Sequence, residues 1–115
     1  MCNINTFSLI YELEKRRLNR NKITKFLVHI VMLDKKNIIS SPSTQEKIKD
    51  ILKRRLRSGD VVCEWDINNY LILLMNINQK NVKKVVNRIE NLFKNSIPES
   101  KQLHLYYDYY KIQQN

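Results

Sequence analysis

The side chains best suited to chemistry lie close together in the stretch LRSGDVVCEWDINNYLILLMNIN, residues 56–78. An arginine and an aspartate open it, and a polar turn with two asparagines interrupts its apolar runs. The single glycine, Gly59, excludes a Walker A loop or a dinucleotide fingerprint, because both need several glycines to bring backbone N–H groups against phosphate. His29, Cys63 and His104 are too far apart in sequence for metal-ligand spacing, so each is expected to be an ordinary core or surface residue.

The composition is that of one folded domain covering residues 1–115. A chain of this length with 43% hydrophobic residues can bury a single core. Its longest apolar run, FLVHIVML, is too short to cross a bilayer, and the N-terminus lacks the basic and apolar blocks of a secretory signal. Two cysteines are too few for a disulfide framework. We therefore expect a cytoplasmic domain without a membrane partner.

The charge is strongly positive, with 21 Lys and Arg against 11 Asp and Glu, a net charge of +10. Such a surplus suits an anionic partner, whether nucleic acid, nucleotide or phosphorylated protein. The same surplus is explained as well by composition, because the chain is rich in Asn, Ile and Lys, as AT-rich genomes favour. The charge alone does not choose between these explanations.

Hydrophobic spacing predicts the elements of the first half of the chain. Apolar residues recur at helical spacing over residues 6–20. The run FLVHIVMLD is apolar at nearly every position, which predicts an interior strand ending at Asp34. A loop follows, in which Ser43 and Glu46 have the spacing of a capping box for the next helix. Gly59 stands where that helix needs a left-handed residue at its end.

The second half predicts a hairpin, a helix and a strand. The runs DVVCEW and YLILLMN flank DINN, whose Asp and Asn residues supply a turn. A helix follows Asn78, Pro98 lies in the break after it, and the alternating residues 102–112 form the last strand. The order is a helix and then β-α-β-β-α-β. This order predicts an α+β, ferredoxin-like antiparallel sheet with an extra N-terminal helix.

At the hairpin the sequence resembles the GGDEF family of diguanylate cyclases, which join two GTP molecules into cyclic di-GMP on a ferredoxin-like, nucleotide cyclase-like core. The family pattern is a helix ending in R-x-x-D, a strand, the G-G-[DE]-E-F turn and a strand ending in LL. Here the helix ends in RSGD, Arg57 to Asp60, the strand VVCEW follows, the turn is DINNY, Asp66 to Tyr70, and LILL comes next. The resemblance covers most of the chain, although the family's opening segment D-x-L-T-G-L-x-N-R is absent.

The resemblance implies phosphoryl transfer on magnesium-bound GTP, with one metal-binding carboxylate at the end of the first strand and one in the turn. In this turn Asn68 stands where the metal-binding acid belongs and Asn69 where the glutamate belongs. Asp66 and Ile67 replace the paired glycines, so their side chains would fill space that the phosphates need. Asp34 remains as one acid. We therefore expect a degenerate domain that is not an enzyme and holds no metal or cofactor.

The resemblance also implies a second, inhibitory site for the product. Arg57 and Asp60 match its R-x-x-D motif, and Arg88 falls at the matching place on the following helix. An arginine fork donates two hydrogen bonds to guanine, an aspartate accepts from its N–H groups, and a second arginine neutralises phosphate. The three residues also have an architectural interpretation, which we favour: a helix C-terminal charge, a turn cap, and a solvated or ion-paired cation facing Glu90 or Glu64.

Three functions follow from these observations. The first is a non-catalytic module of a bacterial signal-transduction or transcription-control protein, acting through a protein partner, a neighbouring domain or a homodimer, with this chain as a possible fragment of a longer regulator. The second is a cyclic di-GMP receptor using Arg57, Asp60 and Arg88. The third, ranked lowest, is a basic nucleic-acid-binding domain with LYYDYY as a stacking surface. Nucleic acid is not expected for this domain, since the aromatic-glycine strand motif is missing and alternate tyrosines face opposite sides.

Overall fold

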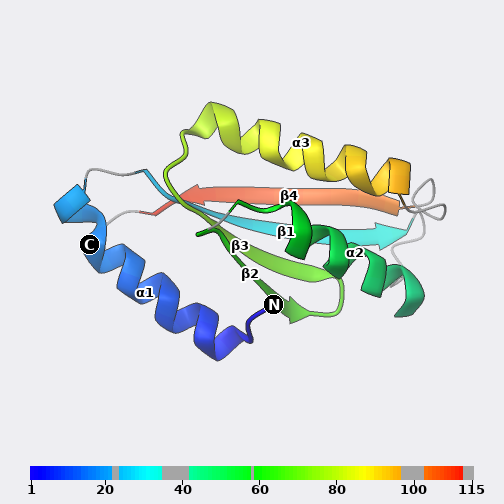
Figure 1. Cartoon of the computed structure of the whole chain (residues 1–115), viewed down its shortest axis with the longest axis horizontal. Coiled ribbons are helices and arrows are strands. Elements are labelled where there is room, and N and C mark those ends of the chain that lie inside the picture. The colour runs from blue at the N-terminus through cyan, green and yellow to red at the C-terminus, as the bar shows by residue number, and fades with distance from the viewer. Residues whose placement is uncertain (22–23, 35–41, 58, 97–102, 113–115) are drawn as a thin grey trace.

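The computed structural model describes residues 1–21, 24–34, 42–57, 59–96 and 103–112. These residues form a four-stranded antiparallel sheet with three helices (Figure 1). The helices are α1 (Ile4–Asn21), α2 (Pro42–Arg55) and α3 (Gln79–Ser96), and the strands are β1 (Phe26–Asp34), β2 (Val61–Asp66), β3 (Asn69–Leu74) and β4 (Leu103–Lys111). The strand order is β2-β3-β1-β4. This arrangement confirms the predicted α+β class, with a helix ahead of β-α-β-β-α-β.

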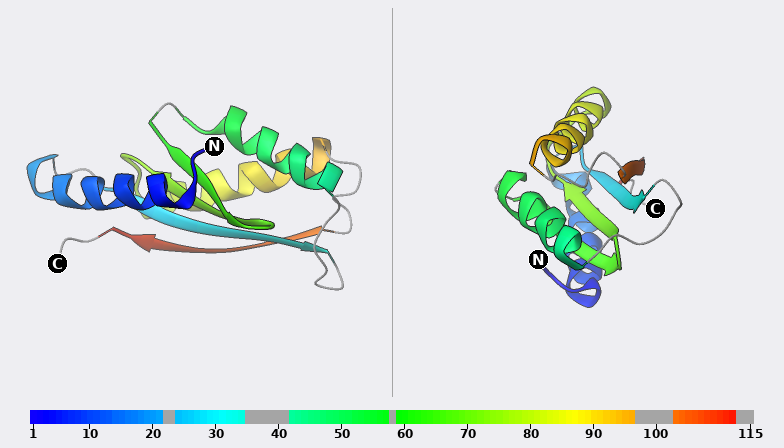
Figure 2. Two further views of the ribbon diagram at one scale, coloured as in Figure 1. Left: turned by 90° about the horizontal axis from the view of Figure 1, so that it is seen from below. Right: turned by 90° about the vertical axis from the view of Figure 1, so that its right-hand side faces the viewer.

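Strand β1 lies inside the sheet, as its continuous apolar run predicts, because it pairs with β3 on one side and β4 on the other. Its alternate residues face the helices α2 and α3, which lie together on one side of the sheet (Figure 2). The apolar stripe of α3 is buried there. The residues that build this larger core from β1 and α3 are Phe26, Val28, Ile30, Met32, Val82, Val86, Ile89 and Phe93. Burying each of these side chains contributes about 1.5–3 kcal/mol.

The opposite face of the sheet carries α1. Phe7 of α1 is buried with Cys63 of β2 and Leu73 of β3 in a second, smaller core. The buried ammonium group of Lys25, just before β1, pairs with the Glu14 carboxylate of α1. This ion pair fixes α1 against the sheet at the start of the first strand. None of the described helices is long and apolar enough to cross a membrane.

Helix α1 begins earlier than the spacing predicts, at Ile4 instead of residue 6. The reason is a cap, because the side-chain oxygen of Asn3 accepts a hydrogen bond from the Thr6 N–H at 2.8 Å. The predicted capping box is wrong for α2. That helix already begins at Pro42, a residue favoured at the first helical position, so Ser43 lies inside it.

Helix α2 ends at Arg55, before the predicted stop at Gly59. Gly59 lies in the turn beyond the helix and has a φ of 96°, the left-handed conformation that its place in the sequence predicts. Pro98 and most of the loop predicted after β1 lie outside the described residues.

Candidate functional site

The turn of the β2–β3 hairpin carries one of the two groups of residues singled out by the sequence, and the other group lies at the opposite end of the hairpin and on α3. The turn is formed by Ile67 and Asn68, between the flanking strand residues Asp66 and Asn69, as the DINN sequence predicts. Asn68 has a φ of 59°, the left-handed region that asparagine tolerates better than most residues. The register shifts between Glu64 and Asp66, so β2 bulges just before the turn.

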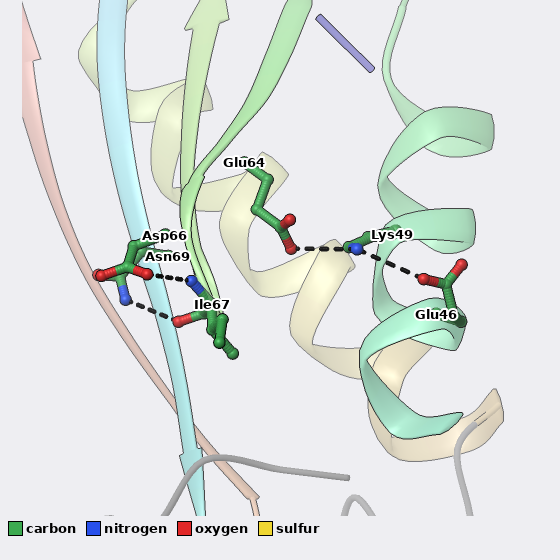
Figure 3. Close-up of polar contacts among 6 residues, drawn as sticks. All are labelled: Glu46, Lys49, Glu64, Asp66, Ile67 and Asn69. Atoms are coloured by element: carbon green, nitrogen blue, oxygen red, sulfur yellow. Dashed lines mark hydrogen bonds and ion pairs between the residues drawn. The ribbon is translucent and has the colours of Figure 1, made fainter. Parts of the chain in front are cut away.

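The polar groups of the turn bond to one another (Figure 3). The Asp66 carboxylate accepts a hydrogen bond from the Ile67 N–H at 2.7 Å. The Asn69 amide donates to the Ile67 carbonyl at 2.9 Å, and its oxygen lies 3.1 Å from Nε2 of His29 on β1. The polar side chains of the turn therefore form hydrogen bonds within the turn and to the neighbouring strand β1.

Asn68 faces the interior. It is 0% exposed, and its carbonyl accepts a hydrogen bond from the Met32 N–H of β1 at 2.9 Å. Tyr70, the last residue of the turn sequence, is also buried, with its hydroxyl beside Glu64 and without a well-formed hydrogen bond to any described residue. Burial, and secondarily the negative charge of Glu64, raises the pKa of the Tyr70 phenol. Both residues anchor the hairpin to the core.

Lys49 of α2 covers this end of the hairpin. Its ammonium group lies 3.3 Å from the Glu64 carboxylate and 3.4 Å from that of Glu46 (Figure 3). Partial burial lowers the pKa of Lys49, but the bonds to the two glutamates outweigh it and raise the pKa overall. Of the two alternatives for Arg88, a solvated or an ion-paired cation, the structure has the first, because its side chain is exposed. Glu64 pairs with Lys49, and Glu90 pairs with Lys94 at 3.2 Å.

The other end of the hairpin is held by Asp60, whose side chain is only 2% exposed. One carboxylate oxygen accepts from the Met75 N–H at 3.0 Å. The other accepts from the N–H of Arg57 at 3.2 Å and from its Nε at 3.3 Å. The Arg57 guanidinium also donates to the Met75 carbonyl at 2.5 Å. Asp60 and Arg57 thus fasten the start of β2 to the end of β3.

A cavity of about 290 Å³ opens beside this corner, between the Arg57 side chain and α3. Arg57, Lys84 and Arg88 line it together with Asn76 and Asn81, so the structure brings the two predicted arginines to one cavity. Asp60 does not line the cavity. Its carboxylate instead accepts a hydrogen bond from the backbone N–H of Met75. Sequence reasoning missed Lys84. Its spacing of four residues from Arg88 on a helix was the available signal.

No protein-family model matches the sequence, and no curated protein matches it significantly. Solved structures do match. The GGDEF domain of YfiN (TpbB) from Pseudomonas aeruginosa has a TM-score of 0.78 at 16% identity, covering 96% of this chain and 76% of that one. The GGDEF domain of DgcB from Caulobacter crescentus, in complex with c-di-GMP, has a TM-score of 0.77 at 7% identity, covering 96% and 70%.

A third match is the diguanylate cyclase SiaD from Pseudomonas aeruginosa in complex with its activator SiaC, with a TM-score of 0.79 at 12% identity, covering 98% of this chain and 47% of that one. The chain has the fold of a GGDEF domain. At identities this low the likeness is one of fold, and it agrees with the resemblance that the hairpin sequence carries.

The donor set of the turn does not fit the magnesium site that the GGDEF family implies. Asn68 and Asn69 offer neutral amides, and Asn68 is turned into the core. Asp34 ends β1 as predicted, but its side chain lies outside the described part of the structure. Among the described side chains, no three of His, Cys, Asp and Glu are grouped so as to hold a metal ion. We derive no catalytic step through a metal here.

Proposed function

We propose that this chain is a non-catalytic regulatory domain with a GGDEF fold, acting by protein interaction within a cytoplasmic bacterial signal-transduction or transcription-control protein. The observation that carries the proposal is the altered turn. Its two amides replace two acids, and its polar groups bond within the turn and to β1. Mg²⁺ requires anionic oxygen ligands, and phosphoryl transfer requires the metal to neutralise developing charge.

The surface beside the turn supports a role in protein contact. Trp65 and Ile67 flank Asp66 and are 57% and 47% exposed. The Trp65 ring makes an edge contact with the ring of His29, with centroids 5.7 Å apart, so its position is fixed before a partner arrives. Exposed, preorganised aromatic residues are frequent anchors of protein interfaces.

A turnover assay with GTP tests the proposal that the domain is not a catalyst. The purified chain is incubated with GTP and Mg²⁺ beside an active diguanylate cyclase as positive control, and cyclic di-GMP is quantified by mass spectrometry. We expect no cyclic di-GMP from this chain at any concentration of the chain. Product that scales with the chain and disappears with EDTA would refute the proposal.

A second candidate function is a cyclic di-GMP receptor. The cationic cavity lined by Arg57, Lys84 and Arg88 favours it, because three positive side chains around one opening suit a phosphate-bearing ligand. The engagement of Asp60 with Met75 and Arg57 weighs against guanine readout through the whole R-x-x-D motif. A dinucleotide bound here would be held mainly through its phosphates.

Calorimetry with cyclic di-GMP decides this alternative. Arg88→Ala is a better variant than Arg57→Ala, because Arg57 also holds the Met75 carbonyl and its loss would disturb the hairpin. Lys94→Ala on the same helix is the matched control, since Lys94 is exposed and outside the cavity. Micromolar binding that Arg88→Ala abolishes and Lys94→Ala preserves would establish the receptor, whereas a flat titration removes it.

A further inference from the structure

The outer edge of β4 is unpartnered among the described residues. The strand order places β4 last in the sheet, and it pairs only with β1. It is nine residues long, about 30 Å of extended chain, and contains neither Gly nor Pro. A long, regular edge of this kind presents a row of free backbone N–H and C=O groups to another strand.

The other edge of the sheet is protected in three ways. Strand β2 has only six residues and bulges between Glu64 and Asp66. The N-terminal segment also covers part of it, because the Cys2 N–H donates to the Val62 carbonyl at 3.3 Å and Cys2 forms a parallel bridge with Cys63. Short length, bulges and covering segments are the devices by which proteins block edge pairing. Within the described parts of the chain, strand β4 has none of these three devices.

The side chains of β4 present aromatic surface on both faces of this open edge. On the face away from α2 and α3, Tyr106 is 51% and Tyr110 is 59% exposed. On the helix-covered face, Leu105, Tyr107 and Tyr109 pack against the core but are only partly buried. An added strand would cover aromatic surface on both sides, in addition to pairing the backbone.

We propose that β4 pairs in antiparallel fashion with β4 of a second copy of this chain, which joins two sheets into one. A twofold axis perpendicular to the sheet keeps the faces of the two copies aligned, so directly opposite residues must belong to the same face. Centring the axis on Tyr106 places His104 opposite Asp108 of the partner subunit, and the reverse. Both side chains are exposed on the open face, so each strand supplies its own complementary pair.

Other registers lose this complementarity. Centring on Asp108 would oppose two carboxylates, which is unfavourable, and centring on Tyr107 would place Asp108 opposite Tyr106 of the partner subunit. The Tyr106 register also sets Leu105 beside the partner's Tyr107 on the helix-covered face. The strand therefore matches itself both in the imidazole–carboxylate pairs and in apolar surface, and a second copy of the chain provides both.

The first experiment measures mass against concentration by sedimentation velocity through the micromolar range. We expect the chain to form dimers, and Tyr106→Lys to weaken them by at least about tenfold, because two lysines then face each other at the axis. Trp65→Lys is the matched control, since Trp65 is exposed to a similar degree as Tyr106 and belongs to the other edge strand. Both substitutions are at exposed positions, so the folded monomer is retained and is verified by circular dichroism.

Charge reversal tests the register. His104→Asp places two carboxylates opposite each other, and Asp108→Lys removes the carboxylate that accepts from the imidazole N–H, so each weakens the dimer. The double variant His104→Asp/Asp108→Lys places a carboxylate opposite an ammonium group at both positions and should recover dimerisation. A monomer at every concentration overturns the proposal, as does a dimer that Trp65→Lys dissociates and Tyr106→Lys does not. A dimer without rescue in the double variant overturns the Tyr106 register. These outcomes are independent of the turnover assay.

Discussion

The two ends of the β2–β3 hairpin use similar polar residues with different results. At the turn, Asp66 and Asn69 bond to Ile67, and Asn68 is enclosed by the core. At the opposite end, where β2 starts and β3 ends, the buried Asp60 carboxylate accepts a hydrogen bond from the Met75 N–H and so links the two strands. Arg57 at this end also lines the cationic cavity. The comparison shows that the polar groups of the turn bond mainly within the hairpin and to β1, whereas the opposite end combines a buried acid with cations that face solvent.

The largest effect is expected at the end opposite the turn. Asp60→Ala should lower the free energy of unfolding by about 3 kcal/mol, because the partly buried Met75 N–H loses its acceptor and Arg57 loses its carboxylate partner. Asp66→Ala is the matched change at the turn and should cost under about 1 kcal/mol, since its carboxylate is exposed and bonds only the next residue. Urea denaturation of both variants measures the difference, and equal losses would contradict this assignment of roles.

An acid introduced into the turn should destabilise it. Asn68→Asp puts a carboxylate at a position that is 0% exposed, which should cost about 2 kcal/mol of stability at neutral pH. The same substitution at the exposed Asn91 of α3 should change stability little. If thermal denaturation shows Asn68→Asp to be as stable as the parent chain, the side chain is not enclosed as described.

Alkaline pH should weaken the turn end specifically. The pKa of Tyr70 is raised in the folded state, so the stability that its neutral phenol contributes is fully present below the unfolded value of about 10 and is lost above it. Stability should fall by as much as about 1.4 kcal/mol per pH unit in that range. Chemical denaturation between pH 9 and 11 measures the slope. Tyr70→Phe should flatten it, and Tyr110→Phe at an exposed site should leave it unchanged.

The smallest effect separates the two arginines of the cavity. Arg57→Ala should cost about 1 kcal/mol, a modest loss because the side chain is half-exposed although it bonds the Met75 carbonyl. Arg88→Ala should leave the unfolding midpoint unchanged. Differential scanning calorimetry of the two variants measures the difference between their unfolding midpoints. A loss with Arg88→Ala equal to that with Arg57→Ala would mean that both are structural.

Much of the fold follows from local patterns. The continuous apolar run of β1 predicts an interior strand, and both faces are indeed covered. The Asp and Asn residues of DINN predict a tight turn, and Asn68 adopts the left-handed conformation that such a turn uses. The capping-box pattern at Ser43 predicts a later start for α2 than the structure has. Both Pro42 and Ser43 are favoured near helix starts, and the helix begins at Pro42.

The site was harder to predict because its contacts depend on register and helix placement. That Asp60 reaches Met75 requires the alignment of β2 with β3, which the R-x-x-D spacing does not contain. That Glu64 pairs with Lys49 requires the position of α2 over β2. The sequence could place Arg57 and Arg88 near each other only through the family resemblance, and it could not distinguish the structural role of Asp60 from ligand binding.

The pairing of β1 with β4 has a consequence for biosynthesis. Phe26, at the start of the first strand, lies opposite Lys111, at the end of the last one. During translation the hairpin can dock on β1 early, but the far side of β1 stays without a partner until β4 has also left the ribosome. The sheet is therefore completed only by its last strand, and a chain that is terminated before β4 exposes its central strand.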